Sequence, residues 1–316
     1  MKIVSLLPSA TEVVCALGLA DSLAAVTHEC DFPPEVRDKP VITRSVLGAG
    51  LSSAEIDAAV RAQLGDSHSL YAIDQTLLAR IAPDLILTQQ LCDVCAVAYD
   101  DVLAAVRSLP RPGPRVLNLE PTTLDDVLGT ITQVGEAAGC PDEALHVVTG
   151  LRGRIEAIRA RAARADSRPR TVLLEWIDPL FGGGHWDPEL VQVAGGHDGI
   201  GCLHGPSTRV NWADIRAFAP QVLVVAQCGF GVERSVQDMP VLEALPGYDA
   251  LPAVRAGRVF VVNGSDYFSR PGPRLVDSLE MLASMIHPET FGPLQVPPAQ
   301  ATRWHPSPPE PERRNR

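Results

Sequence analysis

The chain has 316 residues, of which 46% are apolar, enough to build a packed core in each of two domains. Its formal net charge of −11 argues against binding to nucleic acid or to an anionic membrane surface, because the field of the protein repels phosphate. The seven cysteines are an odd number without a disulfide framework, which predicts a reducing compartment.

The N-terminal segment lacks the pattern of an export signal, since Pro8 and Glu12 break its apolar run. No segment offers the roughly 18 uninterrupted apolar residues that a membrane span requires. We therefore expect a soluble, cytoplasmic protein without membrane insertion.

Apolar strand patterns alternate with helical patterns through the first 140 residues. Residues 3–6, 85–88 and 116–119 are short apolar runs, and each is followed by residues typical of a turn or a helix start. Such alternation predicts a sheet of mostly parallel strands covered by helices. Capping boxes are expected where helices begin, at Ser9 with Glu12 and at Ser52 with Glu55.

A long helical pattern follows, from Pro141 to Arg164, and strand patterns then resume at 171–175, 222–226 and 258–262. We expect two similar α/β lobes joined by one long helix. The predicted division is an N-terminal lobe over 1–140, a connecting helix over 141–166, a C-terminal lobe over 167–288 and a disordered tail over 289–316.

An internal similarity supports two lobes. Residues 81–89 resemble residues 218–226, and each segment is a helix end, an Ala-Pro pair and an apolar strand. Glutamine and cysteine follow both strands, as Gln89 with Cys92 and as Gln227 with Cys228. Because open α/β sheets bind ligands at the carboxyl ends of their strands, we expect a ligand cleft between these two edges, with Gln89 as a contact.

Histidine and cysteine side chains also follow the predicted strands of the first lobe. They suit zinc or an iron–sulfur cluster, and a C-x-x-C pair can also be a redox dithiol or a structural or direct ligand contact. The candidate metal ligands are His28, Cys30, Cys92 and Cys95 of the first lobe, with Cys228 of the second lobe across the cleft.

Several aromatic residues lie in predicted turns or at strand ends, which suits stacking on a flat ligand, although part of them can be ordinary core. They are Trp176, Trp186, Phe230, Tyr267 and Phe268. Arg270 and Arg274 open the last helix, where they either meet an anionic ligand group or are solvated.

Four segments, at 4–12, 31–36, 82–86 and 267–274, resemble the cobalamin and iron-chelate substrate-binding proteins of ABC transporters. The resemblance covers about 2–288. It implies two α/β lobes joined by a rigid helix, with cobalamin, haem or a siderophore held between them and a transporter permease as a partner. By position, the residues that match the family's cleft loops are Pro8, Ser9, Arg44, Ser45, Tyr267, Phe268 and Arg270.

Two hypotheses remain. The first is a binding protein, not an enzyme, for a corrinoid or a related tetrapyrrole, with His28 or His185 as an axial ligand of its metal. The second is a metalloprotein or redox protein that uses the histidine and cysteine cluster. A hydrolase or transferase is disfavoured because the sequence has neither a nucleophile elbow nor a phosphate loop.

Overall fold

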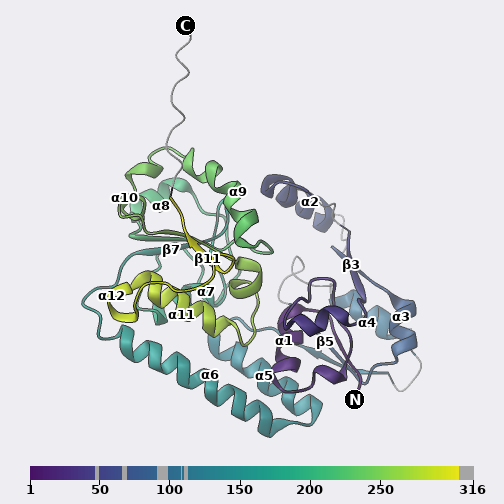
Figure 1. Cartoon of the computed structure of the whole chain (residues 1–316). Coiled ribbons are helices and arrows are strands. Elements are labelled where there is room, and N and C mark those ends of the chain that lie inside the picture. Colours follow the sequence, from purple (N-terminus) through teal and green to yellow (C-terminus); the bar gives the residue numbers. More distant parts are fainter. Residues whose placement is uncertain (47–49, 66–69, 91–98, 108, 110–112, 306–316) are drawn as a thin grey trace.

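A computed structural model of the chain describes residues 1–46, 50–65, 70–90, 99–107, 109 and 113–305. It has two α/β lobes, and the helix α6 (Pro141–Ala162) runs along the base of both (Figure 1). At 1.5 Å per residue α6 is about 33 Å long. The predicted fold class is therefore confirmed.

The sheet of the N-terminal lobe is parallel throughout, in the order β2-β1-β5-β6. Its strands are β1 (Ile3–Ser5), β2 (Leu23–Ala25), β5 (Leu85–Thr88) and β6 (Arg115–Asn118). Apolar side chains on both faces of the sheet are covered by helices. These are α1 (Pro8–Ala16) and α5 (Leu124–Ala138) on one face, and α3 (Gln75–Ile81) and α4 (Tyr99–Arg107) on the other.

A separate antiparallel ribbon projects from this lobe. Its strands are β3 (Thr43–Ser45) and β4 (Tyr71–Ile73), and the helix α2 (Ser53–Gly65) lies between them in the chain. In Figure 1, α2 stands apart from the N-terminal sheet and next to the C-terminal lobe. We call β3, α2 and β4 together the arm.

The C-terminal sheet has the order β11-β10-β9-β7-β8, with β7, β9 and β10 parallel and both edge strands antiparallel. Its strands are β7 (Thr171–Trp176), β8 (Phe181–Gly182), β9 (Val222–Val225), β10 (Val259–Val262) and β11 (Ala301–Arg303). Its helices are α7 (Asp187–Val193), α8 (Trp212–Phe218), α9 (Val232–Glu243), α10 (Pro252–Arg255), α11 (Leu275–Ile286) and α12 (Pro288–Phe291).

The internal similarity found in the sequence corresponds to a repeated structure. Helices α3 and α8 end at Ala82 and Ala219, with φ of 48° and 51°, and a proline follows each of them. A left-handed alanine before proline turns the chain sharply out of the helix and into a strand. The strands that follow, β5 and β9, are fully buried inside their sheets.

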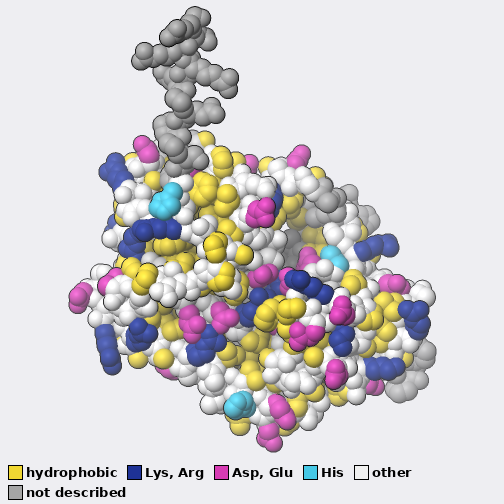
Figure 2. Space-filling view, viewed as in Figure 1, with side chains coloured by type: hydrophobic (Ala, Val, Ile, Leu, Met, Phe, Trp, Pro, Cys, Tyr) yellow, Lys and Arg dark blue, Asp and Glu magenta, His cyan; other side chains and the backbone are white. Residues whose placement is uncertain are grey.

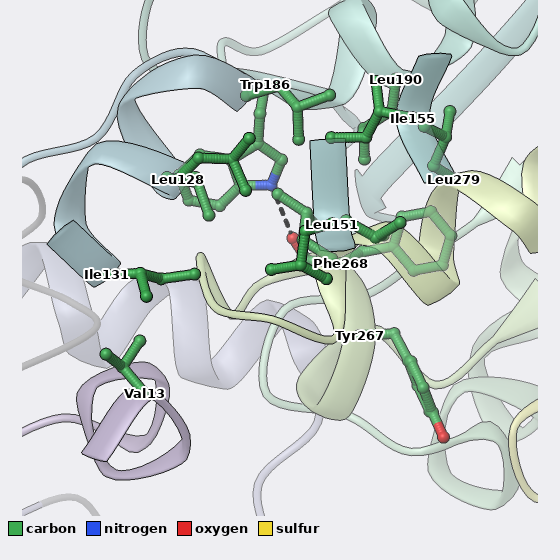
Figure 3. Packing of buried hydrophobic residues seen from close by; sticks show 14 of the residues in the cluster. Val13, Leu128, Ile131, Leu151, Ile155, Trp186, Leu190, Tyr267, Phe268 and Leu279 are labelled. Atoms are coloured by element: carbon green, nitrogen blue, oxygen red, sulfur yellow. Dashed lines mark hydrogen bonds between the residues drawn. The ribbon is translucent and has the colours of Figure 1, made fainter. Parts of the chain in front are cut away.

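One apolar core extends through both lobes. It joins side chains of α1 and α5 to side chains of α7 and α11, together with Leu151 and Ile155 of α6 (Figure 3). At its centre the Trp186 Nε1 donates a hydrogen bond to the Phe268 carbonyl oxygen at 2.9 Å. The lobes therefore pack directly against each other, in addition to being connected by α6.

One of the two expected capping boxes is confirmed and the other is wrong. Ser52 and Glu55 form a reciprocal capping box, which binds both backbone N–H groups. In contrast, α1 begins at Pro8 with Leu7 as its N-cap residue. The Glu12 side chain is not a cap because two arginines of the other lobe bind it, as described below.

The predicted disorder from residue 289 is corrected up to residue 305. β11 pairs with the edge of β10, and the Trp304 Nε1 donates to Glu243 at 2.7 Å. A strand edge that would otherwise lack backbone partners orders this segment despite its proline content. Residues 306–316 lie outside the described part. None of the helices in the described ranges contains an apolar stretch of the length that a bilayer requires.

We expect a chain that ends at Pro298 to lose about 2–4 kcal/mol of unfolding free energy, because the β10–β11 hydrogen bonds and the Trp304 contacts are removed. Urea unfolding measures this change. The matched control ends at His305 and keeps β11. Equal stability of the two truncated chains would contradict a structural role for the strand.

Candidate functional site

The carboxyl ends of the parallel strands in the two lobes face each other. On the N-terminal side, Ser9, His28 and Gln89 follow β1, β2 and β5. On the C-terminal side, Trp176 ends β7 and Cys228 follows β9. Figure 2 shows the surface hollowed between the C-terminal lobe and the arm, and we call this hollow the cleft. The facing strand ends make it the candidate ligand site.

A buried ion cluster closes the base of the cleft. Glu12 of α1 is 3% exposed, and both of its oxygens accept from Arg274, Oε2 from Nε at 3.0 Å and Oε1 from Nη2 at 2.6 Å. Arg270 reaches the same carboxylate at 3.4 Å. Burial raises the pKa of Glu12, and the two arginines oppose that shift.

Arg270 does not point a free guanidinium at a ligand. It is 7% exposed and bonds Asp31 Oδ1 at 2.5 Å and Glu12 Oε1 at 3.4 Å, while Asp266 lies 3.6 Å away. Arg274 is likewise held, over the Phe32 ring at 4.0 Å. The expectation that these arginines either meet an anionic ligand group or are solvated is therefore corrected: both are buried, and carboxylates of the protein already bind them.

The floor of the cleft is closely packed. Ser9 and Gln89 are buried, Pro8 is half-buried, and a small void lies between Ser9, Gln89 and Pro271. Since Ser9 and Pro271 belong to different lobes, the structure brings together segments that the sequence could only place separately. Of the expected ligand contacts Pro8, Ser9 and Gln89, Pro8 keeps the most contact with solvent.

Trp176 and Phe230 form an aromatic wall on the C-terminal side. Their ring centroids are 5.0 Å apart, both rings are half-buried, and the Arg234 guanidinium lies 4.3 Å from the Phe230 centroid. The Trp176 Nε1 donates to the Asp178 carbonyl oxygen at 2.9 Å, which fixes the indole. These rings keep accessible surface of the kind that a flat ligand uses.

The other predicted stacking residues belong to the core. Trp186 is 6% exposed and Phe268 is 1% exposed, and both pack between the lobes (Figure 3). Tyr267 is also buried, although Figure 3 shows its ring pointing away from that cluster. The prediction that Trp186 and Phe268 stack on a ligand is thus corrected, because their surfaces are used for packing.

His28 is exposed at the N-terminal rim of the cleft. Its Nδ1 pairs with the Thr43 hydroxyl at 2.8 Å, and its ring lies against Tyr71 with centroids 5.5 Å apart. Arg44 and Ser45 are exposed on the neighbouring strand β3. His185 is elsewhere, beside Trp186, where burial lowers the pKa of its imidazole.

The predicted cysteine cluster is not assembled by the described residues. Cys30 is buried in the core, its Sγ is 3.1 Å from the Thr11 hydroxyl, and burial raises its pKa, which favours the thiol over a metal-binding thiolate. Cys228 is half-buried in the other lobe. Cys92 and Cys95 lie outside the described residues. Among the residues that are described, no three His, Cys, Asp or Glu side chains could hold a metal ion.

Sequence analysis missed a pair of carboxyl groups, Glu175 next to Trp176 in β7 and the buried Asp187 at the start of α7. Their side chains hydrogen-bond each other, and Glu175 Oε1 also accepts from the Gly184 N–H at 2.6 Å. Burial raises the pKa of both groups, that of Asp187 further through the charge of Glu175. The only sequence signal was a glutamate at the end of an apolar strand.

We expect Glu12→Gln to lower the unfolding free energy by about 3–5 kcal/mol, because two buried arginines would lose their shared carboxylate. Urea unfolding measures this loss. Glu35→Gln, on an exposed nearby turn, is the control and should cost less than about 0.5 kcal/mol. Equal effects of the two substitutions would show that the ion cluster does not fix the lobes.

The Glu175–Asp187 pair predicts stability that decreases with rising pH. Since the folded-state pKa values lie above the unfolded ones, the folded protein holds an extra proton above pH 4 or so, and its stability falls as pH rises through the raised values. The slope should approach about −1.4 kcal/mol per pH unit for one proton.

Asp187→Asn should flatten this slope, because the amide donates to Glu175 without a titrating proton. Urea midpoints from pH 4 upward measure it. Asp249→Asn, which changes an exposed carboxylate of the same lobe, should keep the wild-type slope. Equal slopes for the wild type and Asp187→Asn would contradict a raised pKa of this pair.

Comparison with known proteins agrees with this architecture. Residues 3–265 match the periplasmic binding protein family. A vitamin B12-binding protein of Vibrio cholerae serotype O1 is 24% identical over 286 residues, 90% of this chain and 88% of the relative. The uncharacterized ABC transporter substrate-binding lipoprotein YvrC of Bacillus subtilis is 23% identical over 295 residues, 92% and 81% of the two chains.

Among solved structures, the periplasmic heme-binding protein RhuT from Roseiflexus sp. RS-1 has a TM-score of 0.68 at 22% identity. The match covers 90% of this chain and 97% of that one, and it shows that the fold is shared. Because the family match spans most of the sequence and the two-lobed structure agrees with it, the chain belongs to the periplasmic binding protein family.

Proposed function

We propose that this protein binds cobalamin or a related tetrapyrrole or metal chelate in the cleft between its lobes. The observation that carries the proposal is the aromatic wall of Trp176 and Phe230, which is half-buried at the carboxyl edge of the C-terminal sheet, where the Trp176 Nε1 lies 3.3 Å from the Ser53 carbonyl oxygen of the arm. Relatives named for vitamin B12 and heme binding support this class of ligand.

The wall suits a flat, partly apolar ligand. A tilted pair of aromatic rings offers ring faces for stacking, and each such contact contributes about 0.5–1.5 kcal/mol beyond the buried area. Arg44, exposed on β3 across the cleft, supplies positive charge for the propionate groups of haem or for the phosphate group of cobalamin.

His28 gives the site a ligand for the metal of such a chelate. Because Thr43 binds Nδ1, the remaining ring nitrogen, Nε2, is the one placed for coordination. Imidazole is an axial ligand of iron in many haem proteins. We therefore assign His28, and not the half-buried His185, as the candidate axial ligand.

The partner that fits this role is the permease of an ABC transporter, as the name of the Bacillus subtilis relative indicates. Members of the family bind substrates and leave them unchanged, so we propose a binding function and not catalysis. Cytoplasmic location stays a prediction.

Titration of metal-free protein with cyanocobalamin and with hemin tests the proposal, read by tryptophan fluorescence and by the absorption bands of the ligand. We expect saturable binding of at least one of them. Trp176→Ala should raise the dissociation constant about five- to thirtyfold, because roughly 1–2 kcal/mol of binding free energy from stacking and burial is lost.

Trp212→Ala is the matched control, because Trp212 packs on Tyr248 at the far side of the C-terminal lobe. It should leave the dissociation constant unchanged. If neither ligand binds, and the protein as purified instead contains stoichiometric zinc or iron, the cysteine hypothesis replaces this proposal.

A further inference from the structure

Helix α2 of the arm has little core of its own. Among its described side chains from Leu51 to Gln63, only that of Ser53 is buried, whereas Ile56, Ala59 and Val60 are half-buried. An element that buries so little apolar surface detaches from the rest of a protein at low cost in free energy. Its position therefore depends on a few specific contacts.

Those contacts are with the opposite lobe. Arg209 Nη2 donates to Asp57 Oδ2 at 2.9 Å, the Trp176 Nε1 approaches the Ser53 carbonyl oxygen at 3.3 Å, and Arg234 Nη2 approaches the Leu51 carbonyl oxygen at 3.5 Å. All three donors come from the C-terminal lobe, so the first turns of α2 are fastened to it.

The burial of Ser53 shows how close this contact is. Its side chain hydrogen-bonds Asp238 of α9, which also accepts from Arg234 at 2.8 Å and from Gln227 at 2.9 Å. Burial alone would raise the pKa of Asp238, but these hydrogen bonds hold it below its ordinary value. The acceptor is therefore ionised at neutral pH.

The contact lies at the edge of the candidate site. Trp176 belongs both to the aromatic wall and to the residues that hold α2, and the same arginine that covers Phe230 reaches Leu51. In Figure 1, α2 extends from the β3–β4 ribbon to α9, and Figure 2 shows the cleft opening below it. The lobes are thus joined on two sides, through the shared core and through α2.

We propose that the Asp57–Arg209 and Ser53–Asp238 contacts form a latch that holds α2 across the mouth of the cleft and must open for ligand to pass. The passage of ligand rests on the proposed function, whereas opening of the latch does not. Because the lobes share a core, release of α2 is the motion that widens access without separating them.

Amide hydrogen exchange of the ligand-free chain tests the opening. We expect α2 amides to exchange at least tenfold faster than those of β9, and Arg209→Gln to accelerate α2 a further two- to fivefold, the contribution of one partly exposed ion pair. β9 should not change. Arg152→Gln breaks an exposed pair with Asp125 away from the arm and should leave α2 unchanged.

Stopped-flow binding of cyanocobalamin and of hemin tests the gating. Arg209→Gln should raise the association and dissociation rates by the same two- to fivefold factor, with the dissociation constant unchanged within about twofold. A latch affects both directions of passage, whereas loss of a structural contact to the ligand would raise the dissociation rate alone.

Three results would overturn the latch. The first is that α2 amides of the wild-type chain are as protected as those of β9. The second is that Arg209→Gln accelerates α2 exchange without any change in the binding rates. The third is that Arg209→Gln raises the dissociation rate alone, which would mean that α2 contacts the ligand as a fixed part of the site. If the wild-type chain binds neither ligand while α2 still opens and responds to Arg209→Gln, the proposed function fails and the opening of the latch stands.

Discussion

Glu12 stands between two arginines of the opposite lobe, in a place that water scarcely reaches. A carboxylate buried there without partners would be costly, and so would either arginine. The charges therefore specify one arrangement: α1 of the first lobe must lie beside the segment that begins α11 of the second. The apolar core that the two lobes share lies next to this cluster, since Tyr267 and Phe268 of that core lie just before Arg270 in the chain.

This constraint decides which parts of the molecule can move. The base of the cleft combines an ion cluster with a continuous apolar core, and both resist separation of the lobes. Helix α2 of the arm is held differently. It rests on the opposite lobe through polar contacts and one buried serine, so the structure combines a rigid base with a lightly held cover. Under the proposed latch, the passage of ligand therefore depends on the release of α2 and not on separation of the lobes.

Local patterns predicted the elements well because their causes are local. Alternating strand and helix patterns, the Ser52–Glu55 cap and the repeated Ala-Pro turns depend on residues close in sequence. Contacts between distant segments could not be predicted in this way. Glu12 resembled a cap because it lies three residues after Ser9, and its actual partners, Arg270 and Arg274, lie more than 250 residues away. For the same reason Trp186 and Arg270 looked like ligand contacts, since sequence shows a residue's chemistry but not what already covers it.

The shared core has a consequence for how the protein loses its structure. Two lobes in one chain often unfold in two separate transitions, but here each lobe buries part of its apolar surface only against the other lobe. The lobes should unfold together as one cooperative unit, so a substitution that destabilises one lobe lowers the stability of both. A chain severed within α6 would yield two fragments, each with a large apolar face open to aggregation.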